Sequence, residues 1–159
     1  MRVGGSSVLS FFGDIMEFSE LQALVEVDLK IDDTELDLEA IRTPQLHSKY
    51  LNFYTKYTLQ LKRAEDDRKT MYKDKWEYYQ GNTPEEDLKE KGWEPNPIRI
   101  LKQDLDKYID SDPDIIKHNL RMSAQKEKVD FLDSVLRMIS NRSFQLKGVI
   151  DWEKFKVGI

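Results

Sequence analysis

Hydrophobic residues recur at helical spacing along most of the chain, and no stretch shows the strict apolar–polar alternation of a strand. The longest helical stretch is predicted over residues 44–79, where neither Gly nor Pro follows Pro44. Thr43 before Pro44 is a favourable helix start, because a capping hydroxyl precedes a proline at the first helical position. The apolar seam of this helix has spacings of four, three and four: Leu46, Tyr50, Phe53 and Tyr57.

Two shorter helices are predicted before this one. Residues 18–27 form an amphipathic stretch with Ser19 as the candidate N-cap. Residues 29–40 are acidic, and Asp32 or Asp33 is the candidate cap of a second short helix. The spacing of these carboxylates lacks the central glycine of a calcium-binding EF-hand, so a solvated acidic face is the better interpretation.

The rest of the chain is also predicted to be helical, apart from one loop. A Gly-Asn-Thr-Pro run at residues 81–84 ends the long helix, and residues 82–97 are predicted to be a surface loop or mobile insertion. A short helix is expected over residues 98–109, and Asp112 with Pro113 repeats the cap-plus-proline start.

The second long helix should run to about Phe144, followed by a separate tail at residues 144–159. Its predicted apolar positions are Ile116, Leu120, Val129, Leu132, Val135, Leu136 and Ile139. In the tail, Ile150, Trp152 and Phe155 should cover the end of a neighbouring helix.

These elements predict an all-α fold of long antiparallel helices with short flanking helices. One narrow seam on so long a helix cannot be covered by a single partner of similar length, so we expect a homo-oligomer that assembles through helix faces. Residues 16–159 should form one domain. Residues 1–15 are expected to be a disordered extension, or to precede a functional start at Met16, and their apolar run is too short to span a bilayer.

Charge is distributed in blocks that the formal net charge of −5 conceals. Residues 1–43 carry a net −7, residues 44–82 a net +3, residues 83–119 a net −4 and residues 120–159 a net +3. Local potential decides where a polyanion binds, so this composition leaves a nucleic-acid partner open.

The second half of the long helix carries cations beside aromatic side chains. At about 100° per residue, Tyr72, Trp76 and Tyr79 fall on one stripe of the helix. Two rows of cations flank it: Arg68 and Lys75 on one side, and Lys62, Lys69 and Lys73 on the other. Single-stranded nucleic acid binds such a surface, because bases stack on rings while phosphates lie against cations. The alternative is that the aromatic residues face a protein core, and for Trp76 and Tyr79 packing is the commoner role.

The sequence contains no recognisable catalytic, metal-binding or cofactor-binding motif. It has no cysteine, only two histidines (His47 and His118), and no phosphate-binding loop or nucleophile motif. Asp130 and Asp133 belong to no recognisable acid–base pair. We therefore expect neither an enzyme nor a cofactor.

Three segments in register resemble the UvsY family of phage recombination mediators. They are YKDKWEYYQG at residues 72–81, KIDDTELDLEAIRTPQLHSKYLNFY at residues 30–54 and ISNRSFQLKGVIDWEKFKVG at residues 139–158. The resemblance implies a protein that binds single-stranded DNA as a ring-like homo-oligomer, a hexamer or heptamer. It also implies that the protein helps a UvsX-type recombinase displace the phage single-stranded-DNA-binding protein, in the cytoplasm of the infected host.

The same resemblance implies that Lys73 and Lys75, just before the paired tyrosines, contribute to DNA binding. Lys75 stands where the family leads us to expect Arg, and Asn82 stands where another basic residue is expected. Arg142 and Lys147 form a second basic spot, which either DNA or another subunit could contact. The competing function is a helical scaffold or adaptor that binds only protein.

Overall fold

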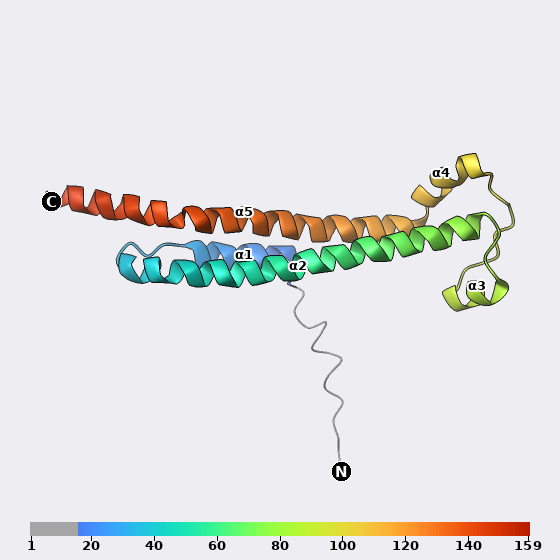
Figure 1. Ribbon diagram of the computed structural model, residues 1–159, viewed down its shortest axis with the longest axis horizontal. Coiled ribbons are helices and arrows are strands. Elements are labelled where there is room, and N and C mark those ends of the chain that lie inside the picture. The colour runs from blue at the N-terminus through green and yellow to red at the C-terminus, as the bar shows by residue number, and fades with distance from the viewer. Residues whose placement is uncertain (1–15) are drawn as a thin grey trace, which may run out of the picture. The chain divides into compact units, whose positions relative to one another are not determined.

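The computed structural model describes residues 16–159, which are helical throughout their regular structure and contain no strand (Figure 1). The all-α fold predicted from the sequence is therefore confirmed. The predicted extension at residues 1–15 lies outside the described residues. In chain order the elements are α1 (Phe18–Leu29), α2 (Leu36–Tyr79), α3 (Glu85–Lys91), the 3₁₀ turn η1 (Lys102–Asp104), α4 (Leu105–Asp110) and α5 (Pro113–Lys156).

Helix α2 begins well before the predicted start. Residues 36–43 were expected to be split between a short helix and a cap, but they form the first two turns of α2, with Pro44 inside the helix. The prediction was wrong because a proline lacks only one helical hydrogen bond, and other contacts hold these turns in place. Among them, the Thr43 hydroxyl donates to the carbonyl of Glu39, and Glu39 itself is buried against Arg142.

The N-terminus of α1 is capped two residues earlier than the sequence suggests. Glu17, not Ser19, is the N-cap, and the backbone N–H of Glu17 donates to the Glu20 carboxylate at 3.0 Å. Glu17 and Glu20 thus form a capping box built from two glutamates.

The end of α2 follows the prediction. Gly81 has a φ of 74°, its N–H donates to Tyr78, and the N–H of Asn82 donates to Glu77. This pair of bonds is a Schellman motif, which requires the left-handed conformation that glycine adopts without strain.

The segment after α2 contains more and shorter structure than expected. Residues 82–97 include α3, which ends at Gly92 in a second left-handed cap, so they are not simply a loop. In the predicted helix over residues 98–109, only η1 and α4 are helical.

Helix α5 begins at Pro113 as predicted, and the Asp112 carboxylate caps it by accepting the N–H of Asp114 at 2.9 Å. The helix continues to Lys156, so the predicted break near Phe144 is wrong. The predicted seam is also shifted at its start, since Ile115 is buried while the side chains of Ile116 and Leu120 are exposed.

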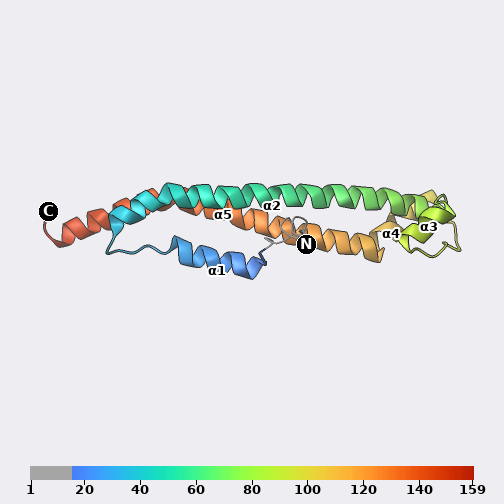
Figure 2. The ribbon, with the colours of Figure 1, turned by 90° about the horizontal axis from the view of Figure 1, so that it is seen from below.

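The chain packs as two compact units, and α2 and α5 contribute residues to both. Of the described residues, the first unit contains residues 16–51 together with residues 134–159. There α1 runs along one side of α2 and α5 (Figure 2). The buried apolar side chains of this unit are Leu21, Val25, Leu46, Tyr50, Val135, Ile139 and Leu146. That residues 16–159 act as one domain remains a prediction.

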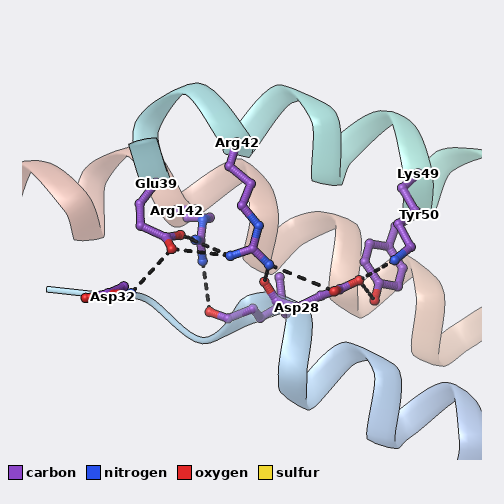
Figure 3. A network of polar contacts seen from close by, with 8 residues as sticks. Asp28, Asp32, Glu39, Arg42, Lys49, Tyr50 and Arg142 are labelled. Carbon is purple, nitrogen blue, oxygen red and sulfur yellow. Dashed lines mark hydrogen bonds and ion pairs between the residues drawn. The ribbon is translucent and has the colours of Figure 1, made fainter. Parts of the chain in front are cut away.

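A polar network joins three segments of this first unit (Figure 3). The buried guanidinium of Arg142 on α5 donates to the Glu39 carboxylate on α2 and to the carbonyl of Leu29 at the end of α1. The Asp28 carboxylate accepts bonds from Lys49 at 2.7 Å and from the Tyr50 hydroxyl at 2.8 Å. Burial raises the pKa of Asp28, but these two partners outweigh it and hold the pKa below 3.8.

The second unit contains residues 52–133, including the basic half of α2, α3, α4 and the first half of α5. Leu105, Ile109 and Ile115 form a buried cluster against the last turns of α2, where Met71, Tyr72 and Tyr79 pack on it. Further along, the buried apolar residues are Tyr57, Ala64, Val129 and Leu132.

Of the three tail residues predicted to cover a neighbouring helix, Ile150 is half-buried within residues 16–159, but Trp152 and Phe155 are not. Trp152 and Phe155 stack on each other with ring centroids 5.6 Å apart, yet both are largely exposed. Phe144 is exposed as well, so the C-terminal end of α5 presents apolar side chains to solvent.

Candidate nucleic-acid interface

Seven residues of α2 are proposed for DNA contact: Lys62, Arg68, Lys69, Lys73, Lys75, Trp76 and Tyr79. Four of them lie on one exposed face of the helix. Lys62, Lys69, Lys73 and Trp76 all face solvent, and at about 100° per residue they fall within an arc of about 60°. We call these four residues the basic stripe. The Trp76 side chain is 38% exposed, which leaves part of its indole ring open for stacking.

The charges of the basic stripe are largely unopposed within residues 16–159. Neither Lys62 nor Lys73 forms an ion pair there. Lys69 Nζ lies 3.3 Å from the Asp66 carboxylate, but both side chains are well exposed, so this pair is weak. Asp66 is exposed and lies about 20° beyond the edge of this arc, so it is an acidic residue placed to oppose a polyanion there.

Lys75 lies about 140° around the helix from Lys62 and faces inward. It is only 5% exposed, and its ammonium lies 3.1 Å from Asp112 and 2.8 Å from Asp114. The ring centroid of Trp93 is 3.9 Å away. Direct contact with DNA, the role implied for Lys75, needs an exposed ammonium, and within residues 16–159 the start of α5 instead supplies two carboxylates that neutralise it.

Tyr79 also belongs to this buried cluster and not to the basic stripe. Its hydroxyl donates to Asp112 at 2.7 Å, and its ring packs on Tyr78 and Tyr108. Burial raises the pKa of Tyr79, and the bond to Asp112 raises it further. Burial also raises the pKa of Asp112, but the bonds from Tyr79, Lys75 and the amide of Asp114 bring it below its ordinary 3.8.

Arg68 is likewise turned toward the protein. It is partly buried, its Nε donates to the side-chain carbonyl of Asn119, and its guanidinium lies 5.6 Å from the ring centroid of Tyr72. The Tyr72 hydroxyl in turn donates to Asp106 at 2.8 Å. The structure thus brings one of the two predicted rows of cations to the surface and uses the other for packing.

Comparison with known proteins identifies the family. The profile of the family described as "Recombination, repair and ssDNA binding protein UvsY" matches residues 24–159. The chain belongs to the UvsY family. UvsY proteins act in recombination and repair and bind single-stranded DNA, and the resemblance seen in the three sequence segments is confirmed.

Known UvsY proteins share both sequence and fold with this chain. It is 27% identical to the "Recombination protein uvsY" of Enterobacteria phage T4 over 143 residues, which cover 90% of this chain and 99% of the relative. A crystal structure of the bacteriophage T4 recombination mediator protein UvsY matches with a TM-score of 0.77 and 27% identity, over 91% of this chain and all of the other. A second crystal form gives a TM-score of 0.77 and 26% identity, over 88% of this chain and 99% of the other.

The match to the UvsY family includes the basic stripe and the buried surroundings of Lys75. Sequence reasoning missed the partners of Lys75, because Asp112 and Asp114 are distant along the chain and Asp112 reads as a helix cap. Trp93 carries no local signal either, since it follows a glycine in what reads as a loop. Lys73 and Lys75 stand two residues apart on one helix, so their side chains point to different sides of it. This spacing was the signal available in the sequence that only one of the two lysines faces the same side as Trp76.

The two residues of the second basic spot, Arg142 and Lys147, also differ in exposure. Arg142 is 2% exposed and engaged with Glu39 and Leu29, so it holds the first unit together. Lys147 is exposed.

Within residues 16–159, no group of three or more His, Asp or Glu side chains could hold a metal ion, and no helix is both long and apolar enough to cross a bilayer.

Proposed function

We propose that this UvsY-family protein binds single-stranded DNA along the basic stripe of α2, without sequence preference, and that it mediates loading of a UvsX-type recombinase. The observation that carries the proposal is the exposure of Lys62, Lys69, Lys73 and Trp76 within one narrow arc. The stripe extends for about 21 Å along the helix, since each residue advances about 1.5 Å.

The chemistry of the stripe suits a nonspecific interaction with a single strand. Lysine ammonium groups bind phosphate oxygens, which are the same at every nucleotide. The Trp76 ring offers a face on which any base can stack. Neither contact reads base identity, so affinity should depend on salt and strand length more than on sequence.

One subunit offers only three lysines, so it should bind weakly and with marked salt dependence. A ring of identical subunits, a hexamer or heptamer, would raise the effective concentration of such sites and make the strand wrap around it. The exposed apolar side chains at the end of α5 support self-association, because contiguous apolar surface usually marks an interface.

A wrapped strand should release the phage single-stranded-DNA-binding protein more readily and accept the recombinase. In this proposal the protein works in the cytoplasm of the infected bacterial host and makes or breaks no covalent bond. Its role is to hold the strand in a conformation that favours exchange between two other proteins.

Fluorescence anisotropy with labelled oligonucleotides tests the proposal. Homopolymers of different base and equal length should bind with similar affinity, and log Kd should change linearly with log salt. A protein that acts only as a scaffold gives no anisotropy change even at low salt, and that result would remove DNA binding from the account.

A further inference from the structure

The ammonium of Lys75 has no donor left for a phosphate. Lys75 Nζ carries three N–H groups, two of which are directed at carboxylates, Asp112 at 3.1 Å and Asp114 at 2.8 Å. The remaining side of the ammonium lies over the Trp93 ring, with the centroid at 3.9 Å. With 5% of the residue exposed, a strand cannot reach the charge without displacing these partners.

The local charge also disfavours a phosphate at this position. Two carboxylates face the single ammonium, and Asp112 is further held by the Tyr79 hydroxyl at 2.7 Å. The Asp114 side chain is 45% exposed, so a strand that approached Lys75 would meet a carboxylate first. Lys73, two residues earlier, has no such acidic partner within residues 16–159.

The partners of Lys75 come from three separate parts of the second unit. Lys75 belongs to the end of α2, Trp93 to the segment after α3, and Asp112 with Asp114 to the start of α5. The segment after α3 has additional ties to the end of α2. Lys91 pairs with Asp74 at 2.8 Å and lies over the Trp93 ring at 5.1 Å.

Two hydrogen bonds to backbone carbonyls complete this attachment. The Tyr78 hydroxyl donates to the carbonyl of Glu94 at 2.8 Å, and the N–H of Ile100 donates to the carbonyl of Tyr79 at 3.1 Å. Residues 82–100 therefore pack on the last turns of α2, and Lys75 occupies the centre of the contact.

We propose that Lys75 is a positioning residue for DNA binding, which fixes the last turns of α2 so that Lys73 and Trp76 face outward together, and that it does not contact the strand. This inference rests on the proposed DNA-binding role of the basic stripe. It predicts that substitution of Lys75 weakens DNA binding by loosening the last turns of α2, whereas substitution of Lys73 removes a phosphate contact.

The experiment compares Lys75→Met with Lys73→Met in the full-length protein, using oligonucleotide anisotropy across a salt titration, thermal melting and tryptophan emission. Lys73→Met should lower the slope of log Kd against log salt by about 0.7, the value for one phosphate on a single strand, with melting and emission unchanged. Lys75→Met should weaken binding at every salt concentration with the slope unchanged, lower the melting temperature and shift the emission. Lys75→Arg, which keeps the charge and can stack on Trp93, should restore binding.

A second variant covers the case in which Lys75→Met does not fold. Trp93→Leu keeps the Lys75 charge but removes the ring over it, and it should also weaken binding with an unchanged slope. A Lys75→Met protein with normal melting and emission but a lower salt slope would overturn the inference. If Lys73→Met changes neither affinity nor slope, the proposed DNA-binding role of the basic stripe is wrong. The melting temperature and salt slope of Lys75→Met still test whether Lys75 is a positioning residue.

Discussion

Lys73 and Lys75 stand two residues apart on α2 and differ completely in their surroundings. Lys73 is exposed and has no ion pair within residues 16–159, whereas Lys75 lies between Asp112, Asp114 and the Trp93 ring. Breaking a buried ion pair by removing one partner destabilises proteins by about 3–5 kcal/mol, while an exposed lysine contributes little. At the scale of single residues, position around the helix therefore decides which side chains can serve DNA and which serve the fold.

The exposed ring of Trp76 should carry a stacking contact. We expect Trp76→Ala to weaken single-strand binding by about 1–3 kcal/mol per subunit bound, since that is the usual loss when a stacking ring is removed. Trp76→Phe is the control, because it keeps an aromatic face, and it should bind much closer to the original protein. Anisotropy at one fixed salt concentration measures both, and equal affinities for the two variants would show that Trp76 does not stack on bases.

Asp66 pairs with Lys69 at 3.3 Å beside the basic stripe, so it should oppose DNA binding there. We expect Asp66→Asn to tighten binding severalfold and to steepen the salt dependence, because one repulsive charge disappears and Lys69 becomes free for a phosphate. The matched control is Asp130→Asn, since Asp130 forms a similar exposed pair with Lys126 at 3.5 Å on α5, outside the stripe. Equal gains in the two variants would point to overall charge and not to the stripe.

At the scale of elements, the sequence predicts a helix end correctly where a single capping residue determines it. Gly81 and Asp112 were recognised from the sequence because each satisfies backbone groups within its own turn. The start of α2 was missed because Glu39 and Arg142, 103 residues apart, hold the turns before Pro44. Contacts between distant residues limit the prediction of the site in the same way. The spacing of residues around α2 predicts the two rows of cations, but only contacts with α5 decide which row is buried.

The Asp112 carboxylate that caps α5 should make the free energy of unfolding depend on pH in the acidic range. The pKa of Asp112 lies below its ordinary 3.8 in the folded protein, so folding favours the ionised carboxylate. This contribution is complete above the unfolded pKa and is lost as the pH falls through the folded value, below 3.8. The unfolding free energy from urea titrations should therefore decrease toward acidic pH, and Asp112→Asn should show a smaller decrease. An identical acid dependence in the variant would remove Asp112 from this role.

At the scale of the whole molecule, the net charge of −5 conceals a basic face that only the arrangement of helices makes evident. In the proposed function, the acidic blocks would keep the chain from binding polyanions everywhere and would restrict contact to this narrow surface. A surface with so few cations gains useful affinity only by repetition, which connects the exposed apolar end of α5 to the proposed function.

Substitution of that apolar end should separate assembly from folding. We expect Trp152→Ser with Phe155→Ser to reduce the native mass toward that of a monomer, because both side chains are largely exposed in the subunit and are available for contact between copies. Helical content should be unchanged, and DNA affinity should fall as multivalency is lost. Sedimentation with and without an oligonucleotide measures this, and an unchanged mass would place the subunit contact elsewhere.

The most direct test of the account is the salt dependence of single-strand binding in a protein whose basic stripe is neutralised. The triple variant Lys62→Ala, Lys69→Ala, Lys73→Ala should keep its melting temperature and native mass, bind far more weakly and lose most of the slope of log Kd against log salt. The control is Lys126→Ala, which removes an exposed lysine on α5 and should behave like the original protein. A triple variant that binds with the original affinity and slope would contradict the assignment of DNA binding to this face of α2.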